Sequence, residues 1–301
     1  MKKVIYYSVL IGIVVFVYFF REDIVKYVFN MMYPKEEVSL DYRNDYYLKY
    51  KYKFFDELKE FKLENKTDLF NVYYTVTNNG YDDFTFYCPE EYENCIEDIK
   101  ALVYDQKQLS IINGFVHPFN SFQNIRTEFN SLGEVNLKII KTYSAEDIRI
   151  ITEKMQNIIQ NEVKDEKDPR KIIKIIHDYI INNTKYDKDR ADNNVIRYRS
   201  NTAYGVLFEG YGICGGYTDA MALFLDYYDI PNFEIASENH IWNAVYIDGQ
   251  WLHLDLTWDD PIISTGEEVL SDTYFLITTE KLKEINDIQH NYSAEIYKEV
   301  A

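Results

Sequence analysis

A two-residue turn signal in the last third of the chain is the feature that most restricts its fold. Asp248-Gly249 separates two runs that are rich in β-favouring residues, 240–247 and 250–257. Asp-Gly is a strong signal for a tight hairpin turn. If these two residues form the whole loop, Ile247 pairs with Gln250 and every other pairing follows. The sequence therefore predicts an antiparallel hairpin of defined register.

This register places four side chains on one face of the hairpin. Because side chains alternate between the two faces of a strand, the shared face carries His240, Trp242, Asp255 and Thr257. His240 and Asp255 become diagonal neighbours, close enough for a hydrogen bond between long side chains. A carboxylate in that position fixes the tautomer of the histidine and stabilises its protonated form. A one-residue bulge would break the parity on which this prediction depends.

A cysteine flanked by glycines precedes a helical run. The segment 210–216 carries Cys214 with two glycines on each side, and an apolar run continues to about Tyr228, before Ile230-Pro231. The N–H groups and dipole at a helix N-terminus favour an anion. They lower the pKa of a cysteine from ~8.5 into the range ~3.5–7.5, which produces the attacking thiolate, and they also suit a developing oxyanion. The alternative is a small buried cysteine that packs the start of the helix.

Cys214, His240 and Asp255 supply the thiol, the imidazole and the carboxylate needed to make a cysteine attack a carbonyl. His253 is a rival base on the same face, but we expect His240 because of its position relative to Asp255. A calcium loop at 259–260 lacks interleaved glycine at ligand spacing. The three tryptophans, at 242, 251 and 258, either fill the core or form a wall around the thiol.

Three motifs resemble the transglutaminase-like superfamily, within the papain-like cysteine-enzyme fold. They are Gly-Ile-Cys-Gly-Gly-Tyr at 212–217, His-Ile-Trp-Asn at 240–243 and Asp-Leu-Thr-Trp-Asp at 255–259. The resemblance is strong over 170–262 and weaker over 145–170. It implies an α+β core in which the cysteine-bearing helix packs on an antiparallel sheet.

The same resemblance implies residue roles: Cys214 as nucleophile, His240 as base and Asp255 as orienting acid. The sequence offers no nucleotide-binding loop, and no cofactor is required. An upstream aromatic or amide side chain often assists the oxyanion in this family, and Tyr204 and Tyr211 are both candidates. Many relatives have alanine after the histidine, whereas this chain has Ile241, which faces away from the site in the predicted register.

Two functions fit these residues. The first is a thiol enzyme acting on amide or peptide carbonyls through a thioester, with water or a lysine amine as the second reactant. The second is a catalytically retired, surface-anchored binding module on the same fold. Because all three residue types are intact, the enzyme is the better prediction. A metal site built from the same three residues lacks a fourth ligand of zinc-like spacing.

The charge balance restricts the partners. A formal net charge of −18 argues against nucleic acid, which requires a basic face. It also suits an anionic membrane surface poorly, and it favours a neutral or basic substrate. A protein or peptide substrate is expected, and cell-wall peptides lie within reach of a tethered enzyme.

The N-terminal segment predicts such a tether. Val4 to Phe20 is an unbroken run of apolar, aromatic and small residues, near the short end of what spans a bilayer. Lys2 and Lys3 precede this run, which places the N-terminus in the cytoplasm. No small-residue cleavage site follows, so an uncleaved anchor is preferred to the alternative, a cleaved signal peptide. We therefore expect a single-pass cell-membrane protein with a transmembrane signal-anchor at 1–20 and an extracytoplasmic catalytic domain.

The rest of the chain divides into a linker at 21–45, a mixed α/β accessory region at 46–143 and the transglutaminase-like domain at 144–301. In the accessory region we expect strands at 46–52, 69–76, 84–87 and 135–141, a turn at 78–80 and a helix at 97–104. In the last domain, Ser144 with Asp147 and then Asp168-Pro169 open two helices, and 187–199 reads as a loop.

The cysteines are expected to differ in state. Cys88 and Cys95 bracket a short polar loop, and in an exported chain they predict a disulfide, with two unpaired thiols as the alternative. Cys214 is then the odd thiol, which makes it a candidate for reactivity.

Overall fold

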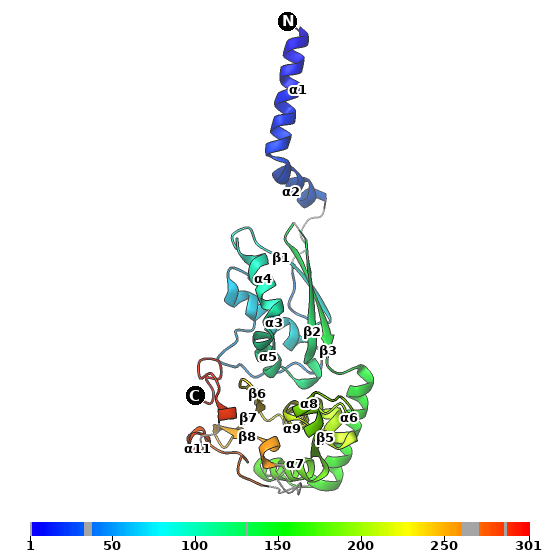
Figure 1. Ribbon diagram of the computed structural model, residues 1–301, viewed down its shortest axis with the longest axis vertical. Coiled ribbons are helices and arrows are strands. Elements are labelled where there is room, and N and C mark those ends of the chain that lie inside the picture. Colours follow the sequence, from blue (N-terminus) through cyan, green and yellow to red (C-terminus); the bar gives the residue numbers. More distant parts are fainter. Residues whose placement is uncertain (1, 33–37, 131, 261–270, 286–287) are drawn as a thin grey trace.

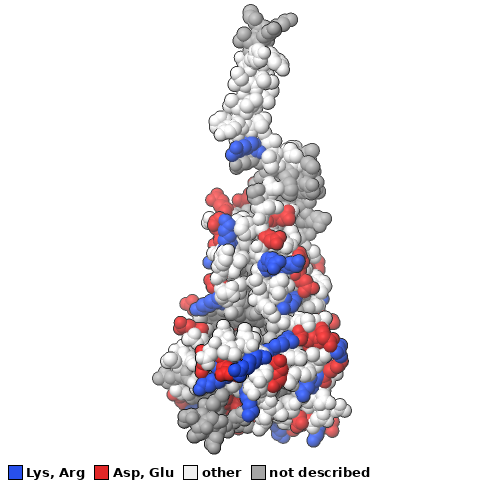
Figure 2. Space-filling view, turned by 45° about the vertical axis from the view of Figure 1, so that its right-hand side comes forward, with Lys and Arg blue, Asp and Glu red and all other residues white. Residues whose placement is uncertain are grey.

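The computed structural model describes residues 2–32, 38–130, 132–260, 271–285 and 288–301. Two N-terminal helices, α1 (Lys2–Phe19) and α2 (Arg21–Met32), project from one end of an elongated body (Figure 1). The part of the body next to them contains a three-stranded sheet, and the far part contains a second sheet with its helices. On the face shown in Figure 2, acidic and basic side chains are intermixed over the body.

The membrane anchor expected at 1–20 is not borne out. The 18 residues of α1 include two lysines at its start, and at ~1.5 Å per residue the rest falls short of the ~30 Å hydrocarbon core of a bilayer. Within the described parts of the chain, no helix combines the length and apolarity that a bilayer crossing requires. The predicted single-pass membrane location, with its cytoplasmic N-terminus and extracytoplasmic catalytic domain, is therefore wrong.

The first sheet is antiparallel, with its three strands in the order β1-β3-β2. The strands are β1 (Asp83–Tyr87), β2 (Phe122–Phe129) and β3 (Glu134–Lys141), and the accompanying helices are α3 (Lys66–Asn79), α4 (Cys95–Tyr104), α5 (Gln106–Gly114) and the short η1 (Pro118–Asn120). The predicted strands at 84–87 and 135–141 and the predicted helix at 97–104 are confirmed within a few residues.

The predicted strand at 69–76 is wrong, because this segment lies inside α3. Leu69, Val72, Tyr73 and Val76 lie at helical spacing, and from Asn71 to Asn79 the helix is buried on nearly all sides. Asn65 caps the start of the helix by accepting from two backbone N–H groups, and Gly80, at φ 82°, ends it. The segment 78–80 therefore ends a helix instead of joining two strands. Residues 46–52 contain no assigned strand.

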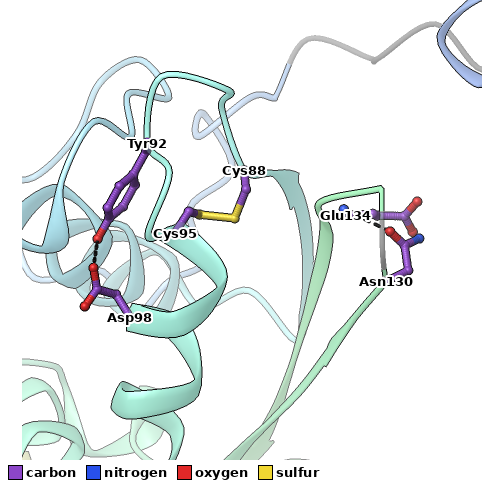
Figure 3. The surroundings of a disulfide bond; sticks show 6 residues. All are labelled: Cys88, Tyr92, Cys95, Asp98, Asn130 and Glu134. Carbon is purple, nitrogen blue, oxygen red and sulfur yellow. Dashed lines mark hydrogen bonds between the residues drawn. A yellow bond between two sulfur atoms is a disulfide. The ribbon is translucent and has the colours of Figure 1, made fainter. Parts of the chain in front are cut away.

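The predicted disulfide between Cys88 and Cys95 is present (Figure 3). It joins the residue that follows β1 to the first residue of α4, with a Cα–Cα distance of 5.9 Å. Inside the same loop, Tyr92 donates a hydrogen bond to Asp98 at 2.6 Å. The disulfide thereby connects the edge of the first sheet to a helix.

Removing this disulfide is expected to lower the free energy of unfolding by about 2–3 kcal/mol, because closing a short loop restricts the unfolded chain. Urea unfolding of the double variant Cys88→Ser/Cys95→Ser against the parent chain measures the loss. Cys214→Ser, which leaves the disulfide in place, is the matched control. Equal midpoints for the double variant and the parent would contradict this prediction.

The second region begins with two helices whose caps the sequence predicts. Ser144 and Asp147 form a reciprocal capping box at the start of α6 (Ala145–Ile158), which continues as a π-helical turn, η2 (Ile159–Val163). Asp168 accepts from two backbone N–H groups at the start of α7 (Pro169–Asn183). The segment predicted as a loop at 187–199 contains a short helix, α8 (Lys188–Asn193), capped by Asp187.

The helix that carries Cys214, α9 (Cys214–Tyr227), packs on an antiparallel sheet of three strands. In spatial order these strands are β6 (Asn232–Ala236), β7 (Ile241–Ile247) and β8 (Gln250–Leu254). Ile247 pairs with Gln250, so the predicted hairpin and its register are confirmed. The smaller elements are β4 (Lys185–Tyr186), η3 (Gly205–Glu209), β5 (Tyr211–Gly212), α10 (Leu256–Asp259), α11 (Thr279–Ile285) and η4 (Ile288–His290).

The two regions share apolar contacts. Phe115, after α5, stacks on Phe233 of β6 with ring centroids 4.9 Å apart, and Tyr297 near the C-terminus stacks on Phe115 at 5.7 Å. Tyr52 donates a hydrogen bond to the carbonyl of Asn232 at 2.5 Å. The accessory region is therefore packed against the sheet of the second region, and the division at 143–144 stays a prediction.

Candidate active site

Cys214 is the first residue of α9 and is half-buried. The preceding residue, Ile213, is extended and has no side chain that can cap the helix. The first N–H groups of an α-helix have no partner within the helix, so the backbone at this end presents donors beside the sulfur. In the described residues Cys214 is the free cysteine, since the other two form the disulfide.

Two glycines allow the start of this helix to pack closely against neighbouring atoms. A Cβ atom on Gly216 would lie 2.3 Å from the carbonyl oxygen of Ser200, and one on Gly212 would lie 2.6 Å from the ring of Tyr217. The N–H of Ile213 also donates to the Ser200 carbonyl at 2.8 Å. The glycines of the motif therefore permit a close approach of backbone to backbone next to the thiol.

His240 and Asp255 meet at the open end of the hairpin. His240 directly precedes β7 and Asp255 directly follows β8. His240 Nε2 lies 2.5 Å from Asp255 Oδ2, and the two side chains are only 4% and 2% exposed. The predicted hydrogen bond between these side chains is present.

The prediction of a longer strand is wrong at this end. The paired register ends at Leu254, and Asp255 instead caps the start of α10, where its Oδ1 accepts from the N–H groups of Thr257 and Trp258. An aspartate satisfies helix N–H groups better than it continues a strand. Both oxygens of the carboxylate are thus held by donors.

The pKa values of the buried pair, His240 and Asp255, are shifted strongly in opposite directions. Burial alone would lower the pKa of His240, but the charge and hydrogen bond of Asp255, together with those of the Cys214 thiol, raise it to about 10. Burial alone would raise the pKa of Asp255, but the charges and hydrogen bonds of His240 and His290 lower it to about 2. An imidazolium and a carboxylate are therefore the favoured states around neutral pH. The Cys214 side chain contributes to the pKa shift of His240, so it lies within interaction range of the imidazole.

Two of the three tryptophans border the His240 ring. Trp242 stacks on it with centroids 5.6 Å apart, and Trp258 meets it edge-on at 6.4 Å. Trp251 instead packs against Phe233 in the apolar core. Core filling is therefore shown for Trp242 and Trp251, whereas a wall around the thiol itself stays a prediction.

A second histidine on the same carboxylate was missed by the sequence analysis. His290 Nε2 lies 2.9 Å from Asp255 Oδ2, and its buried ring stacks on Tyr274 and meets Trp242 edge-on. Its Nδ1 is buried and has no hydrogen-bond partner among the described residues, which makes Nε2 the nitrogen that carries the proton. No local pattern marks His290, since it lies 35 positions after Asp255.

Replacing His290 by alanine is expected to lower the free energy of unfolding by about 2–4 kcal/mol, from the lost hydrogen bond to a charged group and the cavity left behind. The loss of this donor also raises the pKa of Asp255 towards its unfolded value, so acid unfolding begins at a higher pH. His290→Gln, which retains a donor, should recover part of the loss. Ile288→Ala, an exposed change in the same turn, is the control, and equal effects of the two alanine variants would contradict the assignment.

The rival base and the acidic pair at 259–260 are engaged elsewhere. His253 accepts from Trp242 Nε1 at 3.0 Å, its Nε2 lies 3.1 Å from Thr279 Oγ1, and burial lowers its pKa to about 3. Asp259 lies 3.2 Å from His177 Nε2, and Asp260 accepts from Tyr217 at 2.6 Å. These groups hold the scaffold around the site.

The two tyrosines considered for the oxyanion are packed on other rings. Tyr204 stacks on Phe208, and Tyr211 stacks on Tyr198 with centroids 4.0 Å apart. A third tyrosine lies closer to the chemistry: Tyr186 of β4 pairs with Gly212. Burial raises the pKa of Tyr186 to about 12, and the charges of Cys214 and Asp255 add to this effect.

One cluster at the site has the residue types of a metal site. His240, Asp255 and His290 bring two imidazole nitrogens and one carboxylate oxygen within 4.8 Å of one another. The nitrogens lie 2.5 and 2.9 Å from the oxygen, whereas two ligands of a tetrahedral zinc ion lie about 3.3 Å apart. This spacing fits shared protons better than a shared metal.

Comparison with known proteins supports the resemblance found in the motifs. Residues 156–256 match the Transglutaminase-like superfamily, a span that includes Cys214, His240 and Asp255 and ends before His290. No curated protein matches the chain.

Solved structures similar to the chain include a TGase, at 16% identity and TM-score 0.35, with 51% of this chain and 48% of that one covered. They also include a candidate cysteine protease from Cytophaga hutchinsonii, at 15% identity and TM-score 0.28, with 49% and 65% covered. The chain thus spans about half of the first of these proteins and less than two thirds of the second. The α+β region around the cysteine helix and the hairpin is a transglutaminase-like core, as the motifs predicted.

Proposed function

We propose that this protein is a thiol enzyme that acts on amide or peptide carbonyls, with Cys214 as nucleophile, His240 as acid and base, and Asp255 as the orienting carboxylate. The observation that carries the proposal is the buried pair of His240 and Asp255 at 2.5 Å, with the half-buried Cys214 thiol acting on the same ring. Asp255 occupies Nε2 of His240, which leaves Nδ1 for the sulfur.

The first half of the reaction forms a thioester. The thiolate of Cys214 attacks the carbonyl carbon of the amide, and the carbonyl oxygen becomes an oxyanion. The backbone N–H groups at the start of α9, with the hydroxyl of Tyr186 as a further donor, stabilise this oxyanion. The C–N bond then breaks, and the imidazolium of His240 gives its proton to the departing amine or ammonia.

The second half transfers the acyl group. Neutral His240 accepts a proton from water or from a primary amine as that reactant attacks the thioester carbon. The C–S bond breaks and the thiolate is restored beside the imidazolium. Water gives hydrolysis, and an amine gives a new amide, as in a transglutaminase. A protein or peptide substrate is consistent with a transglutaminase-like core.

Asp255 holds His240 in the orientation that both halves of the reaction require. Its Oδ2 accepts from His240 and from His290, and its Oδ1 is held by the first turn of α10. A carboxylate fixed in this way cannot rotate away when the histidine changes its protonation state. The fully satisfied carboxylate is the feature that favours an enzyme over a binding module that has lost its activity.

The test is incubation of the full chain with glutamine-containing peptides, with and without a primary amine donor. We expect ammonia release and, with the amine, a cross-linked product, both dependent on Cys214. Ammonia without cross-linking would assign a hydrolase. No Cys214-dependent product from glutamine-containing or other peptides would favour the binding module.

A further inference from the structure

A cavity of about 570 Å³ lies at the end of α9 that is opposite to Cys214. Its walls come from the extended segment 45–52, the loop at His117, one face of α6 and residues 226–232, which connect α9 to β6. The 14 residues of α9 separate this cavity from the thiol by about 20 Å at ~1.5 Å per residue. The cavity is therefore distinct from the candidate active site.

A buried carboxylate with an unused oxygen lines this cavity. The side chain of Asp226 is only 9% exposed, and Asn232 Nδ2 donates to its Oδ1 at 2.7 Å. Its Oδ2 has no hydrogen-bond partner among the described residues. His117 Nε2 lies 3.6 Å from this oxygen, which is longer than a hydrogen bond. Because buried polar groups are nearly always hydrogen-bonded, this oxygen is a candidate acceptor for a ligand donor, which reaches it once the side chains that cover the oxygen shift.

The charges around the cavity favour a cation. Asp45 and Asp229 also line it, against one basic residue, the exposed Lys49. His117 is neutral, because its Nδ1 accepts from the N–H of Phe119 and burial lowers its pKa to about 3. The C-terminal end of α9, which is the negative end of the helix dipole, also lies at this cavity.

Part of the remaining wall is aromatic. Four tyrosines of the extended segment line the cavity: Tyr46, Tyr47, Tyr50 and Tyr52. Tyr46 is held by His117 and Phe119, with ring centroids 5.1 Å from each. Aromatic rings contact aliphatic chains and attract cations through their faces. The wall thus suits an apolar chain that ends in a positive charge.

We propose that this cavity binds the side chain of a lysine residue from a peptide or protein, with its ammonium group on Asp226 Oδ2 and its aliphatic part along the tyrosines. The ammonium donates a hydrogen bond to the one carboxylate oxygen that is unused. This site is independent of the proposed reaction, because binding there requires no turnover at Cys214.

Binding at this site should depend on pH. Burial raises the pKa of Asp226 to about 7, with Asn232 opposing this effect and Asp229 adding to it. His117, which faces the same carboxylate, stays neutral over this range because burial lowers its pKa to about 3. Because the cation requires the ionised carboxylate, the affinity should fall about tenfold from pH 8 to pH 6.

The experiment uses the full chain carrying Cys214→Ala, so that no substrate is consumed, and calorimetric titration with Nα-acetyl-lysine amide at pH 8. Asp226→Asn, which keeps the acceptor for Asn232, should weaken binding at least tenfold. Asp229→Asn, which removes a charge at the same cavity, should weaken it less than about threefold. Nα,Nε-diacetyl-lysine amide, which lacks the ammonium, should not bind.

Three results would overturn the proposal. The first is the absence of saturable binding of Nα-acetyl-lysine amide up to about 10 mM. The others are an equal loss of affinity in the Asp226→Asn and Asp229→Asn variants, and equal affinity for the diacetylated probe. Thermal unfolding of both variants checks that they fold. If Asp226→Asn does not fold, the tenfold loss between pH 8 and pH 6 decides instead, and an affinity that is unchanged over this range rejects the site.

Discussion

Replacing Cys214 by alanine is expected to reduce amide turnover by about 10⁴-fold or more, because removing the nucleophile leaves only binding and oxyanion stabilisation. The chain should remain folded, since the side chain is half-buried and small. Ammonia release from glutamine-containing peptides, measured beside thermal unfolding, separates these two effects.

The control for this variant is an exposed change near the same helix. Tyr227 lies at the last turn of α9 and is 51% exposed, so Tyr227→Ala should leave turnover almost unchanged. A Cys214→Ala variant that is folded and as active as the parent would contradict the assignment of the nucleophile.

Replacing Asp255 is expected to have the largest effect on stability. Asp255→Ala leaves two buried histidines without their shared acceptor and uncaps α10, and loss of one partner of a buried pair costs about 3–5 kcal/mol. Asp255→Asn keeps an acceptor for the cap but presents N–H groups to one or both histidines. It should destabilise less and still lower turnover by about 10³–10⁴-fold, because the histidine loses its required tautomer.

The effect of these variants should depend on pH in a defined way. The folded pKa of Asp255, about 2, is below its unfolded value, so its contribution is present above pH ~3.8 and is lost as the pH falls towards 2. The folded pKa of His240, about 10, is above its unfolded value, so its contribution is complete below pH ~6.5 and is lost as the pH rises through 10. The difference in stability between parent and variant should therefore be greatest between about pH 4 and 6.5.

Urea unfolding at several pH values measures this difference. Asp248→Asn is the matched control, because Asp248 lies in the turn of the same hairpin and its ion pair with Arg170 is exposed. Such a pair contributes at most ~1 kcal/mol. If Asp255→Ala were no more destabilising than Asp248→Asn at pH 6, the buried pair would not hold the site together.

The parts of the site that the sequence predicts correctly are those determined by residues a few positions apart in the chain. An Asp-Gly turn fixes a register over several residues, so the approach of His240 to Asp255 follows from local geometry. Helix caps likewise follow from one side chain and the next few N–H groups, as at Ser144. Cys214 could be placed at a helix start because glycines precede it and an apolar run follows it, although Ile213 offers no side-chain cap.

The parts that escaped prediction depend on distant contacts or on competing signals. His290 reaches Asp255 only through the path of the C-terminal segment, which has no recognisable pattern. The β-favouring aromatics and valines of 69–76 pointed to a strand, but the segment is helical, because burial of α3 on nearly all sides outweighs local propensity. The apolar run at 4–20 suggested a membrane anchor, although α1 does not meet the requirements of a bilayer crossing.

The most direct test of the central claim, that thiol, imidazole and carboxylate form one unit, is the rate of iodoacetamide labelling of Cys214 between pH 5 and pH 9. The other two cysteines are held in a disulfide, so labelling reports on this one thiol. The claim predicts rapid labelling that persists at mildly acidic pH in the parent and falls at least tenfold at pH 6 in a folded His240→Ala variant. Equal rates in the two proteins across this range would contradict it.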